Sequence, residues 1–230
     1  MIDEPQPASP LLRANNLSKA YRNGTAQTDV LRAVSLELAR GETTSLIGIS
    51  GSGKSTLVSL LAGLRLPDSG EIFFDGQDIT ALDDVERARL RARRIGVVLQ
   101  RDNLIPFLTA MENVRLAIEI AGGRQPGARA KELLTDLGLA HRLNHLPRRM
   151  SGGEAQRVSV AVALANDPEL LLADEITGEL DSSGTEQVMR VVLDAWRGRG
   201  LTILLVTHDQ DLAARTQHRM RLANGELKPA

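Results

Sequence analysis

Two spacings of apolar residues alternate along this chain. Residues 34–38 alternate apolar and polar side chains, as a strand with one buried face does. Residues 43–49 form a mostly apolar run, and residues 54–64 then carry leucines at helical spacing. The same reading predicts strands at 71–74, 95–99, 169–173 and 202–206, and helices at 81–94, 128–137, 153–165, 183–197 and 211–215. Strands that alternate with helices predict an α/β fold with a mainly parallel sheet.

The elements are not spread evenly along the sequence. Residues 11–50 are rich in strand signals, whereas residues 101–165 carry helical patterns and no strand signal. We therefore predict one domain over residues 11–230, with a helical lobe at about 101–165 beside the sheet. Residues 1–10 are acidic and proline-rich and lack an apolar run, which predicts a disordered lead-in and not a signal peptide.

Composition narrows the function classes. Of 230 residues, 42% are hydrophobic and 25% are charged, so the chain can form a packed core. Lys and Arg number 28 against 29 Asp and Glu, which argues against a nucleic-acid partner. The absence of cysteine excludes disulfides, cysteine-bound metals and thiol catalysis. No run of 18 apolar residues is present, so a membrane-spanning partner would have to be another polypeptide.

Residues 48–55 match the phosphate-loop (P-loop) pattern GxxxxGK[ST] in full. The match follows a predicted strand and opens a predicted helix, a context that disfavours a chance glycine-rich turn. Glycines let backbone N–H groups point at phosphate oxygens, and the helix N-terminus adds partial positive charge. Lys54 would reach the β- and γ-phosphates, and the Ser55 hydroxyl would bind Mg²⁺. The nucleotide-binding residues expected here are Gly48, Ser50, Gly51, Ser52, Gly53, Lys54, Ser55 and Thr56.

Two carboxylates, Asp174 and Glu175, end the apolar run that begins at Leu170. The C-terminal ends of parallel strands line the ligand crevice of such sheets. We expect Asp174 to hold Mg²⁺ through water, and Glu175 to polarise the attacking water as a general base. An ordinary strand end with solvated acids is the alternative interpretation, and the upstream P-loop disfavours it.

Residues 150–157, Met-Ser-Gly-Gly-Glu-Ala-Gln-Arg, resemble the signature sequence of ATP-binding cassette (ABC) ATPases, LSGGQ or LSGGE. The resemblance covers residues 11 to about 226, and its other elements follow in the expected order. They are Tyr21 as the A-loop aromatic, Gln100 as the Q-loop glutamine, residues 178–181 as the D-loop with Asp181, and His208 as the switch histidine of the H-loop.

The resemblance implies a P-loop NTPase (RecA-like) core, an N-terminal antiparallel β subdomain and an inserted α-helical subdomain. It implies ATP and Mg²⁺ as cofactors, with Tyr21 stacked on adenine. Ser151, Gly153 and Asp181 would contact nucleotide, and Ser151 would offer the capped helix N-terminus to a γ-phosphate held by a second subunit. Lys54, Gln100, Glu175 and His208 are the implied catalytic residues, and Ser55, Gln100 and Asp174 the implied metal-binding residues.

The implied function is ATP hydrolysis that drives transport. Two copies, or two paired nucleotide-binding subunits, would close around two ATP molecules. They would drive a separate membrane permease at the cytoplasmic face of the cell membrane, docked in a groove near residues 100–112. Within the family, residues 101–114 and 173–182 resemble the lipoprotein-release and macrolide-export group.

Other functions on the same cassette stay open. A regulatory or cell-division-type ATPase, or a soluble ABC ATPase outside transport, would share these motifs. A DNA-repair ATPase would carry a long insertion between P-loop and signature, which this chain lacks. The chain also departs from the family at four positions, Met150, Val162, Ile176 and Glu179. Ile176 stands next to Glu175 where the family usually has proline, and this departure affects the orientation of the expected base.

Overall fold

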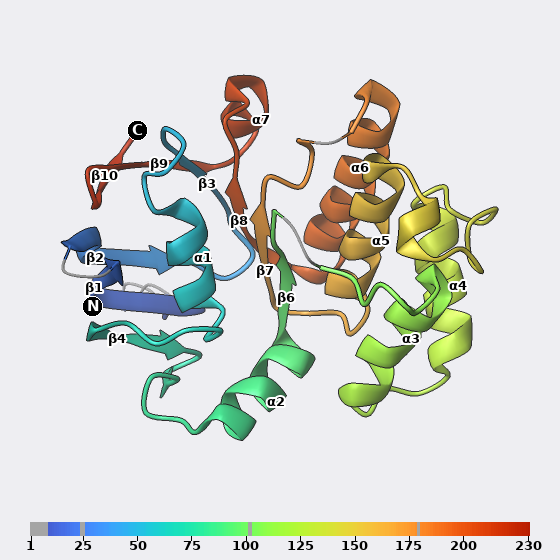
Figure 1. The fold of residues 1–230 in the computed structure, drawn as a ribbon, viewed down its shortest axis with the longest axis horizontal. Helices are drawn as coiled ribbons and strands as arrows, with labels where there is room; N and C mark the ends of the chain where they lie inside the picture. The colour runs from blue at the N-terminus through green and yellow to red at the C-terminus, as the bar shows by residue number, and fades with distance from the viewer. Residues whose placement is uncertain (1–8, 24–25, 101–102, 179) are drawn as a thin grey trace, which may run out of the picture.

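The computed structural model describes residues 9–23, 26–100, 103–178 and 180–230. Strands and helices alternate over most of this length (Figure 1). The strands are β1 (Leu12–Asn23), β2 (Ala26–Leu38), β3 (Thr43–Ile47), β4 (Ser69–Phe74), β5 (Gln77–Asp78), β6 (Ile95–Val98), β7 (Leu170–Asp174), β8 (Thr202–Val206), β9 (His218–Ala223) and β10 (Glu226–Pro229). The helices are α1 (Lys54–Leu61), α2 (Asp84–Arg94), α3 (Ala110–Ile120), α4 (Pro126–Asp136), the 3₁₀ helix η1 (Pro147–Arg149), α5 (Gly152–Leu164), α6 (Ser182–Arg199) and α7 (Gln210–Ala214).

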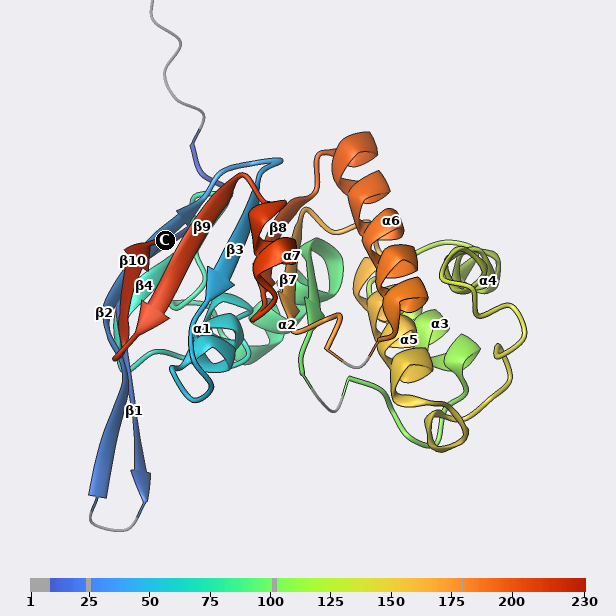
Figure 2. The same ribbon diagram turned by 90° about the horizontal axis from the view of Figure 1, so that it is seen from above.

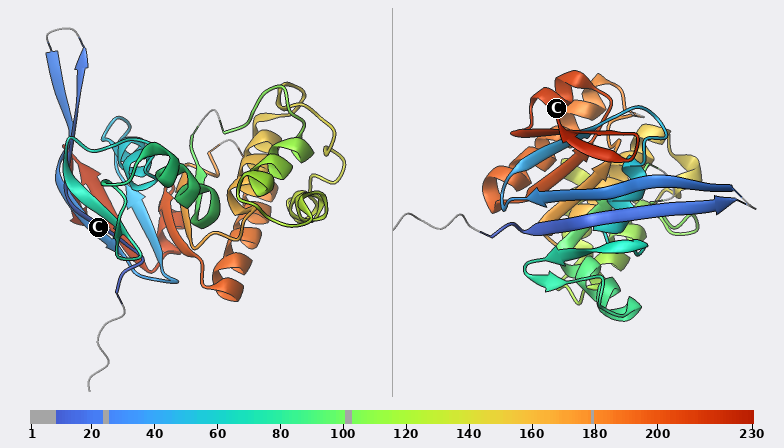
Figure 3. Two further views of the ribbon diagram at one scale, coloured as in Figure 1. Left: turned by 90° about the horizontal axis from the view of Figure 1, so that it is seen from below. Right: turned by 90° about the vertical axis from the view of Figure 1, so that its left-hand side faces the viewer.

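The strands form two sheets. A four-stranded antiparallel sheet has the order β2-β1-β4-β5, and its β1–β2 hairpin projects beyond the rest of the molecule (Figures 2 and 3). A six-stranded sheet has the order β10-β9-β3-β8-β7-β6. Its neighbours are parallel except for the antiparallel pair β9 and β10. The predicted antiparallel subdomain and mainly parallel core sheet are therefore confirmed.

The central strands are buried on both faces because two separate cores cover them. Alternate residues of β7 belong to different cores: Leu170 and Leu172 pack with α1 and the antiparallel sheet, whereas Leu171 and Ala173 pack with α3 to α6. Burial on both faces explains why β7 and β8 are almost continuous apolar runs without a polar alternation. Figure 1 shows α1 on one side of these strands and α5 and α6 on the other.

Helices α3, α4 and α5 pack against one another and form the helical lobe. Both α3 and α5 begin with a capping box, formed at α3 by Thr109 and Glu112. No strand interrupts the described residues between 103 and 165, as predicted. The expected lead-in at 1–10 lies, up to residue 8, outside the described residues, and so do residues 101, 102 and 179.

The C-terminal hairpin of β9 and β10 is absent from the sequence-based prediction. Both strands are short and largely exposed, and in β9 only Leu222 is buried. A strand whose side chains mostly face water leaves no apolar period to detect. Its pairing with β3 nevertheless extends the core sheet toward the antiparallel subdomain.

Candidate functional site

The P-loop connects β3 to α1 through two positions that exclude side chains. A Cβ at Gly48 would lie 2.4 Å from the carbonyl oxygen of Leu222. Gly53 caps α1 with a φ of 102°, and a Cβ there would lie 2.8 Å from a methyl carbon of Val30. Glycine is therefore required at both ends of the loop for steric reasons, which lets the backbone approach a ligand closely.

The side chain of Lys54 reaches back across this loop. Its Nζ donates hydrogen bonds to the carbonyl oxygens of Gly48 (2.8 Å) and Ile49 (2.9 Å). The hydroxyl oxygen of Ser52 is buried and has no partner within the described chain. A pocket of about 500 Å³ lies beside the loop, lined by residues 49–52, by Thr28 to Val30 and Arg32 of β2, and by the β9–β10 turn. The loop thus lines an open pocket with its residues 49–52, while Lys54 is held behind them by the loop carbonyls.

Asp174 ends β7 and is almost completely buried, with 2% of its surface exposed. Burial raises the pKa of its carboxyl group, and the Ser55 hydroxyl opposes that rise. Its Oδ2 has no hydrogen-bond partner within the described residues. A buried acceptor without a partner, beside a serine at the start of α1, is a donor set that suits a cation.

Glu175, Gln100 and His208 come together at the same edge of the sheet. Gln100 Nε2 donates a 2.9 Å hydrogen bond to Oε2 of Glu175, and His208 Nδ1 lies 3.5 Å from its Oε1. Glu175 has a φ of 54°, a left-handed conformation that non-glycine residues seldom adopt, and its N–H donates to Val206. The next residue, Ile176, is buried in the core that lies between the sheet and helices α3 to α6. The structure therefore gathers the three residues that the sequence assigned to one site.

The signature segment forms the N-terminus of α5. Ser151 is its N-cap: its hydroxyl accepts the N–H of Glu154 at 3.2 Å, and the Glu154 carboxylate accepts the N–H of Ser151 at 2.9 Å. Gly153 lies in the first turn. This end belongs to the helical lobe, on the other face of the sheet from α1 (Figure 2). One chain therefore separates its signature from its own P-loop.

Asp181 and Tyr21 belong to other elements of the fold. Asp181 caps α6 by accepting the N–H of Gly184 at 2.8 Å. Tyr21 lies on β1 beside Arg65, whose Nη1 donates to the Tyr21 hydroxyl at 3.3 Å and whose guanidinium carbon is 5.7 Å from the ring centroid. Tyr21 lines a pocket of about 460 Å³ that shares no lining residue with the pocket beside the P-loop.

Sequence reasoning missed residues that hold the site in shape. Asn113 is buried and its amide accepts from Ile105 N–H (2.8 Å) and donates to three carbonyls of residues 105–109. Asn103 accepts the N–H of Leu99 at 2.7 Å, just before Gln100. Arg142 donates to Glu154 at 2.7 Å. These side chains act on neighbouring backbone or on one acid, and an isolated Asn or Arg gives no signal of that in a single sequence.

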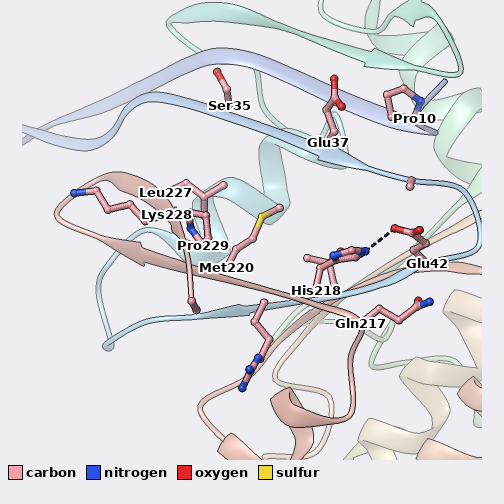
Figure 4. Close-up of a pocket in the computed structure, with 14 residues that line it drawn as sticks. Pro10, Ser35, Glu37, Glu42, Gln217, His218, Met220, Leu227, Lys228 and Pro229 are labelled. Carbon is pink, nitrogen blue, oxygen red and sulfur yellow. Dashed lines mark hydrogen bonds and ion pairs between the residues drawn. The ribbon is translucent and has the colours of Figure 1, made fainter. Parts of the chain in front are cut away.

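A pocket of about 710 Å³ lies at the other end of β3 from the P-loop. It is open and lined by polar and charged side chains, among them His218 and Glu42, whose Nε2 and Oε2 are joined by a 2.7 Å hydrogen bond (Figure 4). None of the residues predicted for the nucleotide site lines it. Size alone therefore does not identify the functional site of this molecule.

No helix in the described part of the chain is long and apolar enough to span a membrane. The fold and the site together define the class of protein: a P-loop core with a helical lobe that carries the capped helix on the other side of the sheet from the P-loop.

Comparison with known proteins places this class in a family. Residues 31–178 match the model of the ABC transporter family. A solved structure described as the dimeric form of MJ0796, a bacterial ABC transporter cassette, is 38% identical, with a TM-score of 0.90, over 94% of this chain and 96% of that one. A second, described as a post-hydrolysis dimer of the ATP-binding cassette MJ0796 bound to ADP and Pi, is 36% identical with a TM-score of 0.90, over 95% of this chain and 98% of that one.

The chain belongs to the ABC transporter family. The fold class predicted from its sequence is confirmed, and so is the type of subunit: an ATP-binding, ATP-hydrolysing cassette like those of the lipoprotein-release and macrolide-export group.

Proposed function

We propose that residues 11–230 are one nucleotide-binding domain that hydrolyses MgATP at a site shared between two copies. Residues 48–56 would bind the phosphates and Tyr21 the adenine. Ser151, Gly153 and Asp181 of the second copy would complete the site. The observation that carries this is the separation of α5 from α1 by the sheet, because one chain cannot bring its own Ser151 to its own P-loop. Both MJ0796 structures are described as dimers, which supports the pairing.

Mg²⁺ is the cation that suits the residues present. Ser55, Gln100 and Asp174 would hold it together with phosphate oxygens, because Mg²⁺ is usually bound by few protein oxygens and several waters or phosphates. The described residues contain no cluster of three or more His, Cys, Asp or Glu. The phosphates of the nucleotide would therefore supply part of the metal coordination. When bound, Mg²⁺ neutralises charge on the phosphate oxygens.

The chain's own residues would handle the water and its proton. Glu175 would accept the proton of the attacking water at its carboxylate. Gln100 holds one carboxylate oxygen at 2.9 Å and so limits the direction in which the base points. His208, whose side chain is 72% exposed, would contact the γ-phosphate once the second copy covers it. Lys54 would exchange its carbonyl partners for the β- and γ-phosphates.

A separate membrane permease is the proposed partner, which would place this chain at the cytoplasmic face of the membrane. A groove of about 290 Å³ between α2, β6, α3 and α5 supports a docking site between the core and the lobe. Leu64 and Ile120 line it and are 43% and 67% exposed. Phe107, within the segment 100–112 expected to receive the partner, is 76% exposed. None of the described residues of the segment 100–112 lines the groove, so Phe107 and the groove are two separate apolar positions that favour a protein partner.

The ATPase proposal is tested on purified protein by phosphate release from ATP with Mg²⁺ and with EDTA. We expect turnover with Mg²⁺ and background release with EDTA. Turnover that is the same in both would contradict the proposed metal site. The absence of turnover under all conditions, with ATP binding intact, would leave a regulatory cassette as the better interpretation.

The permease proposal is tested by affinity capture from detergent-solubilised membranes. The tagged wild type should retain a membrane protein that Ile120→Asp loses. Val85→Asp, at a residue of α2 that is 56% exposed and does not line the groove, is the matched control and should retain it. Equal capture by both variants would remove the groove from the proposal.

A further inference from the structure

The first turn of α5 contains a carboxylate, Glu154, that is held on both of its oxygens. Oε2 accepts the N–H of Ser151 at 2.9 Å, and Oε1 accepts Nε of Arg142 at 2.7 Å. His141 Nε2 lies 3.7 Å from the same Oε1. Only 12% of the Glu154 side chain is exposed, so water screens its charge poorly.

This carboxylate is ionised at every pH at which the protein would work. The Ser151 N–H and, after it, the Arg142 side chain lower the pKa of Glu154 to about 2, against the opposing effect of burial. A negative charge in the first turn stabilises the helix itself. It would also repel any phosphate that binds at the same helix end, unless a cation compensates it.

Arg142 is fixed in place independently of α5. Its N–H donates to the carbonyl oxygen of Leu139 at 2.8 Å, and its own carbonyl accepts from His145 at 2.9 Å. These bonds shape the segment between α4 and η1 into turns. The guanidinium is therefore presented to Glu154 by the backbone of a neighbouring segment and keeps only 33% of its side chain exposed.

We propose that Arg142 is a positioning residue that neutralises Glu154, so that the N-terminus of α5 can bind the phosphate of a nucleotide held by a second copy of this chain. This inference rests on the proposed composite site. It differs from a purely mechanical role in one respect. If the charge matters, removing the cation and removing the anion have opposite effects on dimer formation. If the ion pair only holds the two segments together, both changes weaken the dimer.

The test uses a Glu175→Gln background, in which ATP-bound dimers should persist. Arg142→Gln, Glu154→Gln and the double variant are compared with this parent by sedimentation at saturating ATP. Gln at position 154 keeps the capping box. Arg142→Gln should weaken the dimer by about tenfold or more, the scale of a lost bond to a charged group. Glu154→Gln should leave it equal or tighter, and the double variant should lie within about threefold of the parent.

Two controls separate charge from folding. Arg142→Lys keeps the cation and should stay close to the parent. Binding of a fluorescent ATP analogue to the monomer uses the chain's own P-loop and should be equal in all variants. If Arg142→Gln does not fold, the effect of Glu154→Gln on dimer affinity still distinguishes the two roles of the pair.

The proposal is overturned if Glu154→Gln weakens the dimer, or if the double variant is no better than Arg142→Gln. A parent that forms no ATP-dependent dimer defeats the composite site itself, and the inference with it. That outcome is distinct because it appears before any change at 142 or 154.

Discussion

Gln100 and Glu175 are 75 residues apart in the chain and are joined by a 2.9 Å hydrogen bond from Nε2 to Oε2. They follow β6 and β7, which are neighbouring parallel strands, so both side chains emerge at the same edge of the sheet. Glu175 has a left-handed backbone at this contact, with a φ of 54°. The segment that leads into the helical lobe thus begins at Gln100, which contacts the proposed base Glu175. A movement of the lobe would therefore change the position of the Glu175 carboxylate.

We expect Glu175→Gln to bind ATP normally and to lower the rate of hydrolysis by about 10²- to 10⁴-fold, because an amide cannot accept a proton from water. The measurement is phosphate release together with ATP-dependent elution by size exclusion, in which the variant should elute earlier with ATP than without. Near-normal turnover would assign the base elsewhere, with His208 as the next residue to change.

Lys54→Ala should reduce ATP turnover by about a hundredfold or more, because a preorganised cation at the phosphates is lost. Affinity should fall more for ATP than for adenosine, since the proposed contacts of Lys54 are with phosphate only. Binding is measured by calorimetry for both ligands. The variant also loses two bonds to loop carbonyls, so its circular dichroism is compared with wild type. Unchanged turnover would contradict the P-loop assignment.

A composite site allows two inactive variants to restore each other. Lys54→Ala and Ser151→Arg should each be nearly inactive as homodimers. A mixed dimer collects both defects in one site and leaves the other intact. If half of the dimers are mixed and the sites act independently, activity should return to about a quarter of wild type. Activity that stays at the level of the separate preparations speaks against independent sites and makes the next measurement necessary.

Crosslinking gives that second measurement. The chain has no native cysteine, so Ser50→Cys and Gly153→Cys can be placed in separately tagged copies without background. Both positions are solvent-accessible in the single chain. An ATP-dependent disulfide should join the tags, because the proposed dimer brings the two Cα atoms within about 7 Å. No crosslink, together with turnover per chain that is unaffected by dilution, would refute the composite site.

Glu154 should make stability fall at low pH. Its pKa of about 2 in the folded protein lies below the value of about 4.3 for an unfolded chain. The stabilisation is therefore fully present above about pH 4.3 and is lost as the pH falls toward 2. Urea unfolding between pH 6 and pH 2.5 should show a smaller decrease for Glu154→Gln than for wild type. Glu71→Gln, at an exposed residue of β4, is the control and should follow the wild-type curve.

Apolar patterning made the core of the fold predictable. The runs that became β7 and β8 were identified to within one residue, because apolar runs this short, bounded by turn signals, favour buried strands over helices. The hairpin of β9 and β10 could not be found in the same way, since its position depends on pairing with β3 and not on a pattern of its own. Long-range pairing is a property of the whole chain.

The site divided along similar lines. Lys54, Asp174 and Glu175 were predicted from their spacing and their place after a strand, and their assignment to the site stays a prediction. Arg142 was missed because its partner, Glu154, lies in a different element, and the pairing exists only in the folded molecule. The left-handed backbone at Glu175 was equally invisible, since the sequence shows only that Ile176 frees a position where the family has proline.

Alternate burial along β7 has a consequence for how this protein can change over generations. A single inserted or deleted residue in that strand would exchange the leucines of the two cores and would place a different side chain at each of the positions now held by Asp174 and Glu175. One insertion or deletion would therefore disrupt both the packing of the two cores and the placement of the two carboxylates. Length variation is therefore expected to accumulate in the exposed connections of the helical lobe, while β7 changes only by replacement of one side chain with another.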